Sequence, residues 1–247
     1  MPQLRPGAAK NKYVYFKELI CRYTNNILLI DNETVYSLIE NMFSVMRECF
    51  RSRTVNVGMD EAFMVGRGKY YDLHGDTNKF GIMLRHLKRV SEIARQYGFN
   101  MLMWSDMFFH LATGNQYEGA TKINSEISKD IPENTQLIYW DYRVAPAEHF
   151  DKLISLHNEL KQGTWFAGGL ATTHSYSPHN HLSLEANRTA IQCCKKNGVN
   201  DVIMTIWGGD GIKESRFSML PALFHAAELA KGNTDEKDIK QQFKEKY

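Results

Sequence analysis

The sequence predicts an α/β fold in which about five parallel strands alternate with helices that lie outside the sheet. Five short apolar runs, at 54–58, 99–104, 137–140, 164–170 and 202–206, have the length of strands. Longer segments between most of them carry apolar residues at helical spacing. Strands and helices that alternate in this way build a parallel sheet with outer helices. At 247 residues the chain can bury one sizeable core.

The first strand–helix repeat starts after a segment without a clear period, residues 1–30, which we expect to be irregular. Asp31 and Asn32 can cap a helix at about 33–50, whose apolar residues fall on one face. The strand at 54–58 follows this helix. Glycines at positions 66, 68 and 75 then mark a loop.

Glycine and proline delimit the next repeats. A helix at about 78–97 ends before Gly98, a residue type favoured just beyond a helix C-terminus. Residues 110–133 lack a clear pattern, and a short helix within a long loop is the expectation there. Pro146 can open the following helix at its first position, and Gly163 can close it.

The last repeats have helices at 182–196, ended by Gly198, and at about 219–231. The charged tail can form one more helix. We therefore predict an irregular segment at 1–30, a partial barrel domain at 31–233 and a helical tail at 234–247.

Composition narrows the classes of function. The net charge of +2 and the absence of a long basic run argue against a nucleic-acid partner. No stretch is long and apolar enough to cross a membrane, and we expect no membrane partner. The four cysteines show no metal spacing, and reduced thiols in a cytoplasmic protein are the simplest interpretation.

Two adjacent carboxylates, Asp60 and Glu61, follow the first strand. Catalytic residues of parallel α/β folds lie at this carboxyl end. Neighbouring side chains on an extended chain point in opposite directions, so this pair would not share one proton. We expect one carboxylate to reach the bond that breaks and the other to reach a different part of the substrate. The alternative is an ordinary helix cap after a strand.

The residues around this pair resemble glycoside hydrolase family 20, the β-N-acetylhexosaminidases, whose signature runs His-x-Gly-(Gly or Met)-Asp-Glu. The similarity begins with Asn56–Ala62 and Val65–Tyr70 and is greatest to the bacterial branch with Gly-Met-Asp-Glu-Ala. Further motifs follow in order at Met103–Met107, Tyr139–Tyr142, Trp165–Gly169 and Thr205–Gly208. The resemblance therefore covers nearly the whole chain.

The resemblance also makes the expected fold more specific. The catalytic domain of the family is an eight-stranded barrel, and this chain resembles its fourth to eighth strands. We therefore expect a partial (β/α)8 TIM barrel, and we favour a fragment of a longer product. The strands at 54–58 and 202–206 would be open edges. Self-association through these edges is the alternative.

The resemblance implies retaining, substrate-assisted hydrolysis of terminal β-linked GlcNAc or GalNAc, without a cofactor. Glu61 would donate and later recover the proton, and Asp60 would accept a hydrogen bond from the acetamido N–H. A dry pocket that raises the pKa of Glu61 is expected. The partner would be an oligosaccharide or a small molecule with a terminal N-acetylhexosamine.

Tryptophans at predicted strand ends suit a sugar pocket. Trp104, Trp140 and Trp207 offer aromatic faces to a pyranose. Each could instead be a core residue, but three at strand ends favour a pocket. Tyr142 could donate to the acetamido oxygen.

Polar residues near the other strand ends complete the predicted substrate site. Asp106 and Asp141 follow two of the tryptophans, and sugar contact and helix capping are equally plausible for both. Asn56 stands where the family usually has His. Gly209 stands where it usually has Asp, and Asp210 could substitute for it. These differences suggest altered hydroxyl recognition or relaxed function.

A loop contains His174, His179 and His181. A zinc site is conceivable, but the neighbouring residues suit an ordinary turn, and we expect no metal. His174 with Lys213 could accept an anionic sugar substituent, although a loop histidine and a solvated lysine are the simpler interpretation.

The second interpretation of the whole chain is a catalytically inactive fragment or carbohydrate-binding remnant of the family. An arginine from the early barrel grips the outer hydroxyls of the sugar in the family, and no residue here corresponds to it.

Overall fold

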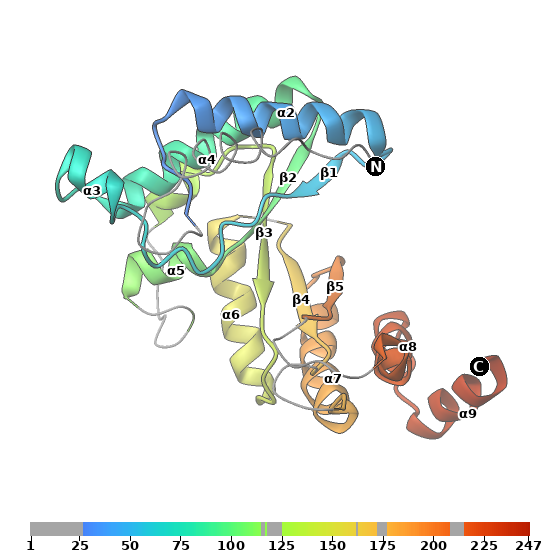
Figure 1. The fold of residues 1–247 in the computed structure, drawn as a ribbon. Coiled ribbons are helices and arrows are strands. Elements are labelled where there is room, and N and C mark those ends of the chain that lie inside the picture. Colours follow the sequence, from blue (N-terminus) through green and yellow to red (C-terminus); the bar gives the residue numbers. More distant parts are fainter. Residues whose placement is uncertain (1–26, 115–116, 118–124, 162, 172–176, 208–214) are drawn as a thin grey trace. The chain divides into compact units, whose positions relative to one another are not determined.

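The computed structural model describes residues 27–114, 117, 125–161, 163–171, 177–207 and 215–247 (Figure 1). The chain divides into two compact units, Met1–Thr135 and Gln136–Tyr247, and each is described by itself.

The first unit combines two parallel strands with helices. Its described elements are α2 (Glu33–Cys49), β1 (Thr54–Asn56), α3 (Lys69–His74), α4 (Lys79–Gln96), β2 (Asn100–Trp104), α5 (Asp106–Thr113) and the 3₁₀ helix η1 (Ser125–Asp130). In the register of the two strands, Thr54 lies opposite Asn100 and Asn56 lies opposite Leu102. Helices α2 and α4 pack against each other (Figure 1).

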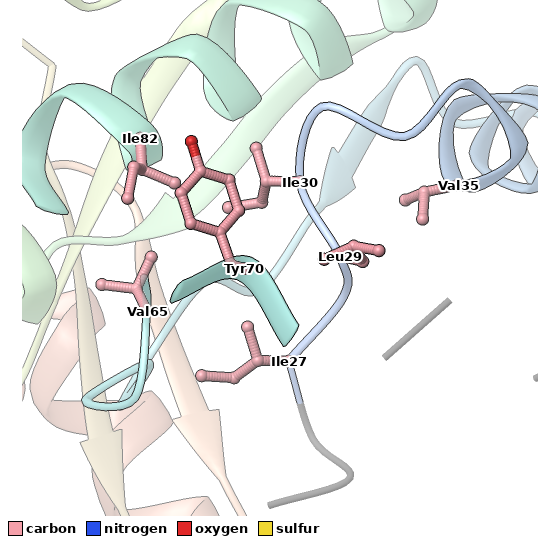
Figure 2. Packing of buried hydrophobic residues seen from close by; sticks show 7 residues of the cluster. All are labelled: Ile27, Leu29, Ile30, Val35, Val65, Tyr70 and Ile82. Atoms are coloured by element: carbon pink, nitrogen blue, oxygen red, sulfur yellow. The ribbon is translucent and has the colours of Figure 1, made fainter. Parts of the chain in front are cut away.

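A cluster of seven buried apolar residues forms part of the core of this unit (Figure 2). The cluster brings the segment before α2 against the residues that follow β1 and the start of α4. Its members are Ile27, Leu29, Ile30, Val35, Val65, Tyr70 and Ile82. This packing fixes residues 27–30 beside the turn that follows β1.

The second unit also combines parallel strands with helices. Its described elements are β3 (Thr135–Trp140), α6 (Ala147–Leu160), β4 (Trp165–Gly169), α7 (Asn180–Lys196), β5 (Val202–Thr205), the 3₁₀ helix η2 (Arg216–Met219), α8 (Leu220–Lys231) and α9 (Glu236–Lys246). Parallel pairing joins β3 to β4 and β4 to β5. Ile191 of α7 packs against Ala226 and Leu229 of α8.

The α/β class with five parallel strands is confirmed in the part of the chain that the structure describes. The strands alternate with helices, and their order within each unit follows the sequence, as in a partial (β/α)8 barrel. Each predicted strand agrees with the observed one to within two residues at either end. Asn32 caps α2 as predicted by accepting the Thr34 N–H.

Some predicted boundaries were wrong. Pro146 is the cap of α6 and not its first residue, because its backbone is extended (ψ 161°). The same helix ends at Leu160, where Lys161 turns extended, three residues before Gly163. The loop expected around positions 66–75 contains the short helix α3, and α5 directly after β2 was not predicted.

In the described residues, no helix combines the length and the apolar character that a membrane span requires.

Candidate functional site

The predicted catalytic pair lies on a left-handed turn beyond β1. Gly58, Met59 and Glu61 have φ values of 75°, 70° and 48°. Methionine and glutamate rarely adopt this conformation, because their Cβ atoms crowd the backbone. Such strain persists only where the surroundings hold it in place, and it is often found at functional sites.

Hydrogen bonds from β2 hold the start of this turn. The Val57 N–H donates to the Leu102 carbonyl at 2.8 Å, and the Trp104 N–H donates to the Gly58 carbonyl at 3.1 Å. The strand pairing therefore continues to Gly58, the first residue of the left-handed segment. Trp104 itself is buried, which places its ring in the interior of the unit.

Asp106, the first residue of α5, fixes the end of the turn. Its side chain is fully buried, and its Oδ2 accepts the Glu61 backbone N–H at 2.9 Å. A carboxylate acceptor makes this hydrogen bond stronger than a neutral pair would. The observed role is thus to hold the backbone of Glu61, and the predicted sugar contact of Asp106 stays a prediction.

A cavity of about 290 Å³ lies beside the turn, and both Asp60 and Glu61 line it. The rest of its lining is His86 and the apolar or aliphatic residues Ile27, Leu28, Ile30, Val57, Met59, Ala62, Val65 and Met83. Three of these belong to the cluster in Figure 2. Both carboxylate residues are exposed, so the dry surroundings expected for Glu61 are not observed.

His86 of α4 is a polar lining residue that the sequence reasoning missed. Its Nδ1 lies 3.4 Å from the Tyr36 hydroxyl. Burial lowers the pKa of His86 to about 4, so the ring is neutral at physiological pH. The sequence feature that could have revealed His86 is its position one helical turn after Ile82, beside the apolar stripe of α4.

A polar network holds the wall of the cavity formed by residues 27–30. Asp31, at φ 64°, accepts hydrogen bonds from Arg85 at 2.9 Å and from the Tyr70 hydroxyl at 3.1 Å. Burial raises the pKa of Asp31, but the hydrogen bonds from Arg85 and Tyr70 outweigh this effect, and the net pKa is lowered. The carboxylate is therefore ionised and ties this segment to α3 and α4.

In the second unit, three predicted aromatic residues form a connected group. The Trp140 and Tyr142 rings stack with centroids 5.3 Å apart, and the Trp207 Nε1–H donates to the Tyr142 hydroxyl at 2.9 Å. Trp207 is 44% exposed, so part of its side chain is accessible to solvent. Such rings suit the C–H face of a sugar.

Two glycines at the end of β4 make room for this arrangement. A Cβ atom on Gly169 would lie 2.6 Å from the Tyr142 ring, and one on Gly168 would lie 2.1 Å from Asn187 Oδ1. The Asn187 amide donates to the Gly169 carbonyl at 2.9 Å. The glycine pair therefore allows both side chains to pack against the backbone of the strand.

The buried side chain of Asp141 is the centre of a polar cluster in which Arg143 and His149 reach the surface. Its Oδ2 accepts from the Tyr139 hydroxyl at 2.9 Å and from Arg143 Nη2 at 2.9 Å, and it lies 2.8 Å from His149 Nε2. Burial raises the pKa of Asp141, but hydrogen bonds from Arg143 and His149 lower it below its usual value. Asp141 does not cap α6, whose cap is Pro146. Its predicted sugar contact is untested.

Several predictions fall outside the described residues. These are Asp210, Gly209, Lys213 and His174. His179 is described and caps α7, and His181 lies 3.5 Å from Glu185. No group of three or more potential metal ligands occurs in the portion that the structure describes.

The predicted site residues thus form two groups, each within one unit. Asp60, Glu61, Trp104 and Asp106 belong to the first unit. The group in the second unit consists of Trp140, Asp141, Tyr142 and Trp207.

The comparison with known proteins identifies fold relatives only. No family model matches the chain, and no curated protein matches it. Among solved structures, it is similar to an exo-β-N-acetylglucosaminidase of glycoside hydrolase family 20 from Vibrio harveyi in complex with N-acetylglucosamine, with a TM-score of 0.58 and 15% identity. An inactive variant of the V. harveyi enzyme has a TM-score of 0.58 and 14% identity.

Both matches cover 90% of this chain and 35% of the other, so the chain spans about a third of the length of these structures. At this identity the likeness shows a shared fold. Proteins with the same fold can differ in function, so activity has to be argued from the site.

Proposed function

We propose that the chain is a β-N-acetylhexosaminidase-like glycoside hydrolase that removes terminal β-linked GlcNAc or GalNAc with retention of configuration. The observation that carries the proposal is the strained turn at 58–61, which brings Asp60 and Glu61 to one cavity beyond the carboxyl end of β1. The order of the sequence motifs and the fold shared with exo-β-N-acetylglucosaminidases support it.

In the proposed reaction the substrate supplies its own nucleophile. The carbonyl oxygen of its acetamido group bonds to the anomeric carbon as the bond to the leaving oxygen breaks. Glu61 transfers its proton to that leaving oxygen. Asp60 accepts a hydrogen bond from the acetamido N–H and stabilises the positive charge that develops on that acetamido group. Water then attacks the anomeric carbon, Glu61 recovers a proton from it, and the acetamido group re-forms.

This division of labour explains why two neighbouring carboxylates suffice. A pair that faced each other across the sugar would need one residue to attack and one to protonate. Here only Glu61 handles the proton of the leaving group, while Asp60 addresses the amide. The hydrogen bond from the Glu61 N–H to Asp106 keeps the turn that carries both carboxylates in place.

We propose that the aromatic group of Trp140, Tyr142 and Trp207 binds the C–H face of a sugar through ring contacts. Asp210 remains the proposed partner for a sugar hydroxyl. We also propose a cytoplasmic location. Cys49, Cys193 and Cys194 are free thiols, and burial raises the pKa of Cys194 to about 12, so that thiol stays protonated.

The second candidate is a carbohydrate-binding protein of the same fold that does not turn over its ligand. The exposure of Asp60 and Glu61 favours it, because a general acid near neutral pH needs surroundings that disfavour its ionised form. Self-association through the outer strands is a further proposal, which the oligomeric state in solution would test.

Hydrolysis of a chromogenic β-N-acetylglucosaminide by the full chain separates the two candidates. Glu61→Gln should lower kcat by about 10²–10⁴-fold while sugar binding persists. Glu92→Gln, on the exposed side of α4, is the matched control and should leave kcat unchanged. Asp60→Asn should slow hydrolysis and weaken inhibition by a thiazoline mimic of the intermediate. Sugar binding without turnover in the unmutated chain would support the second candidate.

A further inference from the structure

The cavity beside Glu61 has an uneven lining. Asp60, Glu61 and His86 are its polar side chains among the described residues. Its aliphatic lining includes Ile27, Leu28 and Ile30 from the segment before α2, together with Val65 and Met83. Hydrogen bonds from the described lining side chains are therefore confined to Asp60, Glu61 and His86, and the remaining lining side chains offer apolar contacts.

This lining argues against a second sugar ring as the occupant. A pyranose carries several hydroxyls, and every hydroxyl buried without a partner loses the hydrogen bonds it made in water. An anionic group is also disfavoured, because two carboxylates line the cavity and His86 is neutral at physiological pH. The chemistry of the walls suits a neutral, apolar group.

The walls are also held in place before any ligand binds. Asp31 joins Arg85 at 2.9 Å and the Tyr70 hydroxyl at 3.1 Å, directly after Ile30. Asn32 then caps α2. A preformed apolar wall binds its ligand more tightly, because no segment has to be ordered on binding.

We infer that the aliphatic part of this cavity is the aglycone site and that the leaving group of the natural substrate is an alkyl or aryl group. The inference rests on the proposed function. Since Glu61 gives its proton to the leaving oxygen, the atoms joined to that oxygen lie next to Glu61, which lines the cavity. Its volume of about 290 Å³ is near the lower end of small-ligand pockets, which suits one short chain or one ring.

Alkyl glycosides test the inference without a change in leaving-group chemistry. Methyl and hexyl β-N-acetylglucosaminides release alcohols of similar acidity, so a difference in kcat/KM reports contacts with the alkyl chain. We expect kcat/KM at least about tenfold higher for the hexyl glycoside, which is the effect of burying two methylene groups. The β-1,4-linked GlcNAc disaccharide should be a poorer substrate than the hexyl glycoside.

A matched pair of variants tests whether the preference for the hexyl glycoside comes from this cavity. Leu28 lines the cavity, whereas Leu38 of α2 packs on the same apolar cluster away from it. Leu28→Ser should reduce the ratio of hexyl to methyl kcat/KM at least about threefold, and Leu38→Ser should leave that ratio unchanged. Because both substrates are measured on one protein sample, the ratio is independent of the fraction that is folded.

The outcomes distinguish the two levels of the argument. Hydrolysis of the methyl and hexyl glycosides at equal kcat/KM, or a preference for the disaccharide, would overturn the inference and leave the proposed function standing. An equal loss of the ratio in both leucine variants would also overturn it. Absence of hydrolysis of every substrate would reject the proposed function and the inference together.

Discussion

The carboxylate of Asp106 accepts the backbone N–H of Glu61 at 2.9 Å, from a fully buried position at the start of α5. The acceptor and donor are 45 residues apart in sequence. The contact connects the end of β2 to the turn beyond β1, where Glu61 has a φ of 48°. Asp106 is therefore a positioning residue for Glu61 within the proposed reaction.

Replacement of Asp106 should separate this role from sugar contact. Asp106→Ala removes the acceptor, and we expect a loss of about 2 kcal/mol in the free energy of unfolding from the hydrogen bond alone. Asp106→Asn keeps an acceptor oxygen and should recover much of that loss. If Asp106 acts through the backbone of Glu61, kcat falls and KM changes little, because the sugar is not contacted.

Chemical denaturation and steady-state kinetics measure these effects. Asp130→Ala is the matched control, because the Asp130 carboxylate is 48% exposed and pairs with Lys88 at the surface. Its effect on stability should be below about 1 kcal/mol. A large rise in KM for Asp106→Asn at unchanged kcat would favour direct sugar contact instead.

The second prediction concerns the close approach of Gly169 to Tyr142. A Cβ atom at this position would lie 2.6 Å from a ring carbon. Gly169→Ala should therefore displace the Tyr142 ring and cost about 1–3 kcal/mol of stability. The hydrogen bond from Trp207 to Tyr142 would be strained, so tryptophan fluorescence and sugar binding should both change.

Gly81→Ala provides the comparison for this prediction. Gly81 lies inside α4, and a Cβ there has its nearest neighbours at 3.8 Å. Alanine should stabilise that helix by about 0.5–1 kcal/mol. If Gly169→Ala is as well tolerated as Gly81→Ala, Tyr142 has room to move and the proposed packing constraint does not hold.

The sequence was sufficient to predict the positions of the strands, because each strand is a short apolar run with a clear end. It was also sufficient for the cap of α2, since Asn32 acts on its immediate neighbours. Helices α3 and α5 were missed because both are short, and neither spans enough turns to show a helical period. Local pattern thus predicted the elements whose signals are local.

The roles of the acidic residues depend on contacts between segments distant in sequence. For Asp106 the partner is the backbone N–H of Glu61. Because nearly every residue type has a backbone N–H, the residue type at position 61 does not predict this contact. For Asp141 the partner Arg143 is near in sequence, but His149 reaches it only from the first turn of α6. His86 was not predicted as a site residue, because its role depends on the cavity that it lines and the sequence does not show that cavity.

The third prediction is the pH dependence of the Asp141 cluster. The pKa of Asp141 is lowered in the folded protein, so the folded state favours the carboxylate. The resulting stabilisation is present above the unfolded pKa, near 3.8, and is lost as the pH falls through the folded pKa. Asp141→Asn should therefore destabilise the protein most above about pH 4, and the difference from the unmutated protein should shrink in more acidic solution.

Denaturation curves from about pH 2.5 to about pH 7 would measure this difference. Glu92→Gln is the control, because the Glu92 carboxylate is 59% exposed on α4. A constant difference between the Asp141 variant and the unmutated protein at every pH would show that the charge of Asp141 is not what stabilises the cluster.

The fourth prediction concerns His157, whose ring is fully buried in α6 and packs against the tilted Tyr139 ring with centroids 4.7 Å apart. Burial lowers the pKa of His157 to about 4 from 6.5. The unfolded chain therefore binds the proton more readily, and stability falls as the pH drops from 6.5 towards 4. The shift corresponds to about 3 kcal/mol over that window.

His157→Phe should flatten this part of the stability profile, while His181→Phe, at an exposed site, should not. If His157→Phe leaves the slope between pH 6.5 and 4 unchanged, protonation of another group controls acid unfolding and the burial of His157 does not.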